Sequence, residues 1–195
     1  MYEVIGALRT RTFRVLWMLE EMGLDYHHVQ APPRSPEILA VNPSGKVPAL
    51  KVGDTVITDS VAIMTYLADH HEDLTYAAGT LERARQDAMT GFILDEMDGV
   101  LWMAGKHKFV LPKERRVPEI LDSLKWEFEQ SQARFADRIG TGPFVMGETM
   151  TLTDILAAHC GNWAERFGFP MVDPVWIAYL DRMRARPAFR KLDAG

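Results

Sequence analysis

The stretch from Asn42 to Leu67, NPSGKVPALKVGDTVITDSVAIMTYL, constrains the fold of this chain more than any other segment. Its apolar runs ALKV and TVIT are joined by Gly53-Asp54 and are typical of a β-hairpin. Asp59-Ser60 then precedes an apolar stretch with helical spacing, so a helix is predicted to begin there. Because a helix N-terminus attracts anions, the segment indicates a site for a carboxylate or phosphate.

The Val47-Pro48 bond, which stands before the first of these strands, is expected to be cis. A proline at a strand entrance cannot donate to a ladder, and X-Pro is the bond type that readily becomes cis. A cis bond would turn the Val47 N–H and C=O outward, where they can pair with an extended chain as in strand addition. Together with the helix N-terminus, this predicts a pocket for a small, extended, acidic peptide.

Two kinds of pattern divide the chain. Strand signals at Tyr2–Ile5, Tyr26–Val29, Ala49–Val52 and Thr55–Thr58 alternate with helical patterns up to about residue 75. The remainder is purely helical in pattern, with long apolar periodicities over residues 81–102, 118–139, 152–167 and 175–185. Such segregation predicts an α/β domain over residues 1–75 and an all-α domain over residues 80–195.

Composition excludes several functions. The net charge is −5 with a pI near 5.7, whereas nucleic-acid-binding domains usually carry a basic patch. Cys160 is the single cysteine, which rules out an internal disulfide and fits a reducing compartment, so we expect a cytoplasmic protein. The histidine pairs have no partners at metal-ligand spacing, and no metal is expected.

Four segments, TFRVLWMLEEMGLDY, NPSGKVPAL, TDSVAIMTYL and FVMGETMTLTDILAA, are spread over most of the chain and together resemble the cytosolic, bacterial-type glutathione S-transferase family. The resemblance implies a thioredoxin-like N-terminal domain that binds glutathione as co-substrate, followed by an all-helical C-terminal domain. It also implies a homodimer, for which we take the apolar-acidic stretch Phe92–Met97 as the interface.

The resemblance places the thiol-activating group in the turn between the first strand and the first helix. Members of the family have Tyr, Ser or Cys there, whereas this chain has Thr10, Arg11 and Thr12. Thr10 aligns at or next to the reactive position and would donate its hydroxyl to the sulfur. Arg11 would add positive field, and Thr12 is the second candidate, although its position before Phe13 favours a role as helix cap.

The remaining site residues follow from the same motifs. Asp59 and Ser60 would hold the γ-glutamyl end of glutathione, unless they are an ordinary N-cap pair. Val47 would pair with the cysteinyl backbone, Pro48 would fix that turn, and Lys46 would reach the glycyl carboxylate. The electrophile would lie against the helical domain at Trp102, Met103, His107 and Phe109.

The expected activity is conjugation of the glutathione thiolate to small electrophilic compounds, as in detoxification, with no metal and no covalent enzyme intermediate. A glutathione-binding or regulatory protein with negligible turnover is the alternative, because threonine replaces the usual activating residue. A glutathione-dependent isomerase of the zeta-like branch is disfavoured, since the Ser-Ser-Cys run of that branch is absent from residues 9–12. The series Thr151-Leu-Thr-Asp154 is a capping box, which we assign to folding.

Overall fold

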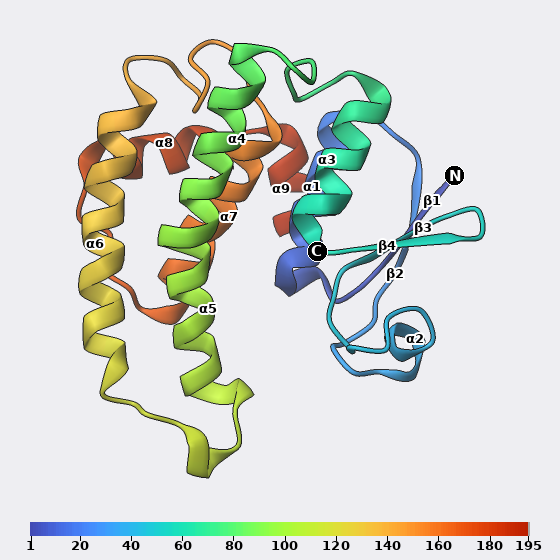
Figure 1. Cartoon of the computed structure of the whole chain (residues 1–195), viewed down its shortest axis with the longest axis horizontal. Helices are drawn as coiled ribbons and strands as arrows, with labels where there is room; N and C mark the ends of the chain where they lie inside the picture. The colour runs from blue at the N-terminus through green and yellow to red at the C-terminus, as the bar shows by residue number, and fades with distance from the viewer. Residues whose placement is uncertain (195) are drawn as a thin grey trace. The chain divides into compact units, whose positions relative to one another are not determined.

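The computed structural model describes residues 1–194, and these divide into two compact units (Figure 1). The first unit comprises Met1–Ala78 together with the residues from Ala185 on, and the second comprises Gly79–Arg184. The sequence-based division assigned everything after residue 80 to the helical domain, whereas the C-terminal residues cluster with the first unit.

Four short strands form one mixed sheet in the first unit, in the order β2-β1-β3-β4. β1 (Tyr2–Ile5) is parallel to β2 (Tyr26–Val29) and antiparallel to β3 (Ala49–Val52), which pairs with β4 (Thr55–Thr58). The parallel pair requires a crossover, which α1 (Phe13–Glu21) supplies. All four strands have the bounds that the sequence pattern predicted.

Both faces of this sheet contribute to the core of the unit. Val4 and Ile5 are buried and, as successive strand residues, point to opposite faces. Ile5 packs in a cluster that includes Ile38 of the short helix α2 (Pro36–Leu39). α3 (Ser60–His71) contacts β3 and β4 and packs against α1, whose residues 15–19 are fully buried.

The helix α9 (Pro187–Asp193) joins the first unit by packing against α1. The Phe189 ring lies 5.4 Å from that of Phe13 and 5.0 Å from that of Trp17, centroid to centroid and edge-on in both cases. Arg186 donates from Nε and Nη2 to the two carboxylate oxygens of Glu21, each over 2.7 Å. These contacts explain why the C-terminus departs from the predicted domain division.

Five helices make up most of the second unit: α4 (Leu81–Ile93), α5 (Gly99–Gly105), α6 (Ile120–Ile139), α7 (Leu152–Phe167) and α8 (Pro174–Arg184). An irregular helical segment, Leu94–Asp98, connects α4 to α5. Phe92, Ile93 and Met97 are buried inside this unit, with exposed fractions of 6%, 0% and 0%. These three apolar side chains therefore belong to the core of the unit, and the prediction that the stretch Phe92–Met97 forms a dimer interface stays a prediction for its exposed residues.

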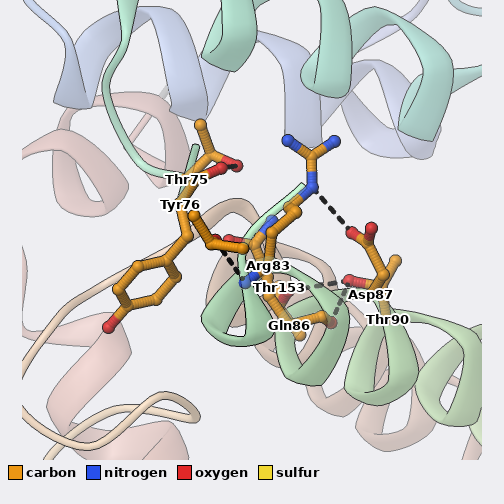
Figure 2. Close-up of polar contacts among 8 residues, drawn as sticks. Thr75, Tyr76, Arg83, Gln86, Asp87, Thr90 and Thr153 are labelled. Atoms are coloured by element: carbon orange, nitrogen blue, oxygen red, sulfur yellow. Dashed lines mark hydrogen bonds and ion pairs between the residues drawn. The ribbon is translucent and has the colours of Figure 1, made fainter. Parts of the chain in front are cut away.

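Hydroxyl and carboxyl groups connect the helices of the second unit. The Thr90 hydroxyl on α4 donates to the Gln86 carbonyl and lies 2.8 Å from the Thr153 hydroxyl on α7, as Figure 2 shows. Thr151 and Asp154 form the expected capping box at the start of α7. Burial raises the pKa of the Asp154 carboxyl to about 6, while hydrogen bonds from Thr151, Val145 and Tyr179 act to lower this pKa.

Candidate functional site

The turn between β1 and α1 holds a pair of bonded hydroxyl groups. Thr10 Oγ1 donates to the Ala7 carbonyl oxygen over 2.6 Å and lies 2.9 Å from Thr12 Oγ1. Since the Thr10 proton is directed at Ala7, Thr12 is the donor in the hydroxyl–hydroxyl bond. Thr10 and Arg11 are partly exposed, whereas Thr12 is fully buried. Of the two threonines, Thr10 is therefore the more exposed.

Thr12 does not act as the predicted helix cap. Its dihedral angles, φ −58° and ψ −35°, are already helical, and its side chain makes no capping hydrogen bond. An N-cap residue usually has extended dihedral angles and accepts from the following backbone N–H groups. The hydroxyl of Thr12 instead bonds Thr10 and faces Gly6, so its role is to support the turn.

Gly6 brings this turn next to Val47. A Cβ at Gly6 would collide with Thr12 Oγ1 and lie 3.1 Å from Val47 Cβ, and the Gly6 φ of +154° is one that L residues rarely adopt. A glycine is therefore required for the approach of the two segments. The Val47-Pro48 bond is cis, which confirms the prediction; Val47 is partly exposed and Pro48 is buried.

The turn before Val47 is held by its own polar groups. The Asn42 side-chain amide donates to the Lys46 carbonyl oxygen over 2.8 Å, and the Ser44 hydroxyl accepts from the Lys46 N–H over 3.4 Å. The Lys46 side chain itself is exposed. The backbone of this turn is thus fixed, while the ammonium group remains in solvent.

Asp59 caps α3. Its Oδ1 accepts from the N–H groups of Val61 and Ala62, over 2.9 Å and 3.1 Å. Its φ of 74° lies in a region that non-glycine residues rarely occupy, and such residues cluster at functional sites. The geometry is that of an N-cap, which was one of the two interpretations of this residue, and it places the carboxylate at the helix N-terminus.

Ser60, the next residue, is only 1% exposed, and its Oγ accepts a hydrogen bond from Arg14 Nη1 over 3.3 Å. Arg14 lies in the first turn of α1 and is fully buried. The bond therefore joins the beginning of α1 to the beginning of α3. Sequence reasoning did not include Arg14 in the site, although a single arginine within the apolar series TFRVLWML was the available signal.

The predicted electrophile residues lie on α5 and in the turn that follows it. Trp102 and Met103 on α5 are partly buried, and the Trp102 ring lies 6.5 Å from that of Trp163 on α7. Phe109 is 57% exposed. His107 Nδ1 accepts from the Val117 N–H over 3.0 Å, so the neutral imidazole carries its proton on Nε2.

Arg116 holds the turn that presents His107 and Phe109. Its guanidinium donates to the carbonyl oxygens of Leu111, Lys108 and Phe109, over 2.8, 3.1 and 2.9 Å. These carbonyls lie at the end of a helical segment, where backbone acceptors lack intrahelical partners. The turn is therefore a defined structure and not a loose connection.

No group of three or more His, Cys, Asp or Glu residues among residues 1–194 is arranged to hold a metal ion. Over the same range, no helix combines the length and apolar character that a membrane span requires.

Comparison with known proteins identifies the family. The model of the glutathione S-transferase N-terminal domain matches residues 10–70. Glutathione S-transferase 4 of Zea mays is 31% identical over 197 residues, which cover 92% of this chain and 85% of the maize protein. Glutathione S-transferase theta-2 of Homo sapiens is 30% identical over 134 residues, 64% of this chain; the match spans 53% of the human protein, about half of its length.

A solved structure gives the same result for the fold. A glutathione transferase homologue from Sulfitobacter, crystallised with bound glutathione, superposes with a TM-score of 0.86. The match covers 100% of this chain and 97% of that one, at 21% identity. The chain belongs to the glutathione S-transferase family, with a thioredoxin-like N-terminal domain followed by an all-helical domain.

Proposed function

We propose that this protein binds glutathione through its first unit and conjugates the glutathione thiolate to small electrophilic compounds, as in detoxification. The observation that supports binding most strongly is the Ser60 hydroxyl. A guanidinium has no acceptor atom, so Ser60 accepts in its bond with Arg14 and keeps its own proton for another partner. Among residues 1–194 that proton has no acceptor, which suits a hydroxyl that donates to a ligand carboxylate.

The other residues of the first unit complete the proposed glutathione site. The γ-glutamyl carboxylate would accept from Ser60, and the neighbouring ammonium would donate to Asp59. The backbone of Val47, held in place by Pro48, would pair with the cysteinyl residue, and Lys46 would reach the glycyl carboxylate. The homologue from Sulfitobacter, which carries bound glutathione, supports this choice of ligand.

Thiol activation is assigned to the turn that contains Thr10. The thiol of glutathione resembles that of cysteine, with a reference pKa near about 8.5, and a donor beside the sulfur lowers such a pKa. Thr10 can donate to the thiolate if its proton leaves the Ala7 carbonyl, and a charge-assisted bond is stronger than the neutral bond it replaces. Thr12 would keep Thr10 oriented, and Arg11 would add positive field.

The proposed chemical step is attack of the thiolate on an electrophilic carbon. A carbon–sulfur bond forms. In substitution, a leaving group departs with its electron pair. In addition, the π bond of an activated double bond breaks, and its electron pair moves away from the attacked carbon and then takes a proton from water. Trp102, Met103, His107 and Phe109 would bind the electrophile, so that proximity supplies much of the rate. The mechanism requires neither a metal nor a covalent enzyme intermediate.

One observation favours the second candidate function, a glutathione-binding protein with little turnover. The bond of 2.6 Å from Thr10 to Ala7 is short, and the thiolate has to compete with it. A protein in which the thiolate loses this competition would still bind glutathione through Ser60 and Val47, but would activate the thiol poorly.

Isothermal titration with glutathione and an assay of thioether formation on several electrophiles separate the two functions. We expect binding by the wild type and about 10- to 100-fold weaker binding by Ser60→Ala, because a hydrogen bond to a charged group is lost. Thioether formation above the uncatalysed rate supports the transferase, and binding without it supports the second candidate. Absence of glutathione binding by the wild type would refute both.

Two further properties belong to the proposal. We propose a two-fold symmetric homodimer, for which sedimentation should show twice the monomer mass at micromolar concentration. A monomer under those conditions would contradict it. We also propose a cytoplasmic location, which fractionation of cells can test; recovery in another compartment would contradict it.

A further inference from the structure

We propose that Arg14 is a specificity-determining positioning residue, which makes the Ser60 end of the site select a carboxylate over an uncharged group of similar size. The inference rests on the proposed function, since the carboxylate in question is that of the γ-glutamyl residue of glutathione. Arg14 would not touch the ligand; it would act through Ser60 and through its own charge.

The direction of the Arg14–Ser60 bond is the first argument. All guanidinium nitrogens are donors, and the group keeps its positive charge in proteins, so the hydroxyl is the acceptor over the observed 3.3 Å. A hydroxyl that accepts from a cation becomes a better donor, because the bond polarises it. Arg14 therefore both fixes the Ser60 oxygen and turns its proton toward a ligand.

The distance is the second argument. A carboxylate oxygen bonded to the Ser60 hydroxyl would lie at most about 6 Å from Arg14 Nη1, because an O–H···O bond adds about 2.7 Å. Arg14 is fully buried and Ser60 is 1% exposed, so water screens little of this interaction. A unit charge at this distance changes the affinity for an anion by about 10- to 100-fold at an effective dielectric constant of about 20.

The cap of α3 is the third argument. Asp59 already accepts from the Val61 and Ala62 N–H groups, so these two amides of the helix N-terminus are occupied. The Asp59 carboxylate also opposes a second negative charge beside it. The ligand ammonium would offset the charge of Asp59, which leaves the ligand carboxylate to be offset by a second cation, and Arg14 is held next to Ser60 by the observed bond.

Binding of two probes by titration tests the role of Arg14. The probes are glutathione and its α-carboxamide, in which an uncharged amide of similar size replaces only the α-carboxylate of the γ-glutamyl residue. The wild type should prefer glutathione by about 10-fold or more. Arg14→Met should lose most of this preference by weakening glutathione alone, whereas Arg14→Lys, which keeps the charge, should retain it.

Arg9→Gln is the matched control, because it removes one positive charge from an exposed position in the preceding turn. It should leave the preference unchanged within about 3-fold, as expected for a screened charge. Equal weakening of both probes by Arg14→Met would show a purely structural role and overturn the inference, whereas the proposed function would stand on glutathione binding by the wild type.

If Arg14→Met does not fold, the preference of the wild type for glutathione over the second probe still tests the inference. A preference below about 3-fold would overturn the inference, because no charge effect of the expected size would exist. A preference above about 10-fold that Arg14→Lys retains would support it. Failure of the wild type to bind either probe would instead refute the proposed function and the inference with it.

Discussion

Replacing Asp154 by asparagine should remove a pH dependence of stability that the buried carboxyl imposes on the second unit. Asp154 is fully buried, and its Oδ1 accepts from the Val145 N–H over 2.7 Å and from the Tyr179 hydroxyl over 3.0 Å. Its Oδ2 accepts from the Thr151 N–H over 2.8 Å. Burial outweighs these bonds and raises the pKa of the carboxyl to about 6, from 3.8 for the ordinary group.

The sign of the effect follows from proton binding. Between pH 4 and pH 6 the folded state holds a proton that the unfolded chain has released, so the free energy of unfolding falls as pH rises. The contribution is fully present below about pH 4 and lost as pH rises through the folded pKa of about 6. A shift of about two pKa units corresponds to about 3 kcal/mol.

Asparagine keeps one oxygen acceptor but turns an amide donor toward the Thr151 N–H. The variant should be less stable than the wild type by about 1–3 kcal/mol at pH 4, because one buried donor loses its acceptor. The difference should then shrink by up to about 3 kcal/mol toward pH 7, where the wild type must bury a charge.

Urea unfolding followed by circular dichroism from pH 4 to pH 7 measures this difference. Asp122→Asn is the matched control, because the Asp122 side chain is 94% exposed on α6, and its difference from the wild type should change by less than about 0.5 kcal/mol. A wild-type advantage over Asp154→Asn that grows with pH would refute the reasoning. It would mean that the hydrogen bonds to the Asp154 carboxylate outweigh burial and lower its pKa.

Three other predictions concern the first unit. Thr10→Ala should raise the thiol pKa of bound glutathione, measured by thiolate absorbance against pH, more than Thr12→Ala does; the reverse order would exchange their roles. Gly6→Ala should lower the free energy of unfolding by about 2 kcal/mol or more through steric conflict, whereas Gly91→Ala in open space on α4 should raise it by up to about 1 kcal/mol; equal effects would contradict this. Arg186→Ala should lower the free energy of unfolding by about 1–3 kcal/mol and speed hydrogen exchange in α9. Unchanged exchange would show that the bond from Arg186 to Glu21 does not hold this helix in place.

The strands and long helices were predictable because local pattern and tertiary role agree. The runs at Ala49–Val52 and Thr55–Thr58 are short, β-rich and bounded by a turn, and α7 begins at a capping box. At these positions local propensity, turn chemistry and burial favour the same structure. The bounds of the four strands and of α7 therefore follow from the sequence alone.

The errors occurred where long-range contacts decide the structure. α9 follows the helical domain in the sequence but packs on α1 through Phe189 and Arg186, and no local pattern records that preference. The apolar side chains around Phe92, expected at a subunit interface, lie in the core, because a core face and an interface face have the same periodicity. Thr12 was expected to be a cap because it precedes an apolar run. Its dihedral angles are helical instead, because they depend on the backbone conformation of the preceding turn.

Ser60 and Thr10, at the two ends of the proposed glutathione site, differ in whether the hydroxyl proton is already hydrogen-bonded within the protein before glutathione binds. At Ser60, Arg14 already orients the hydroxyl, and the proton has no acceptor among residues 1–194, so binding a carboxylate breaks no protein hydrogen bond. At Thr10, the proton is already bonded to Ala7, so stabilising a thiolate requires that bond to be exchanged. Affinity for glutathione and activation of its thiol should therefore depend on different residues. Substitutions at Ser60 and Arg14 should change the first, and substitutions at Thr10 and Thr12 should change the second.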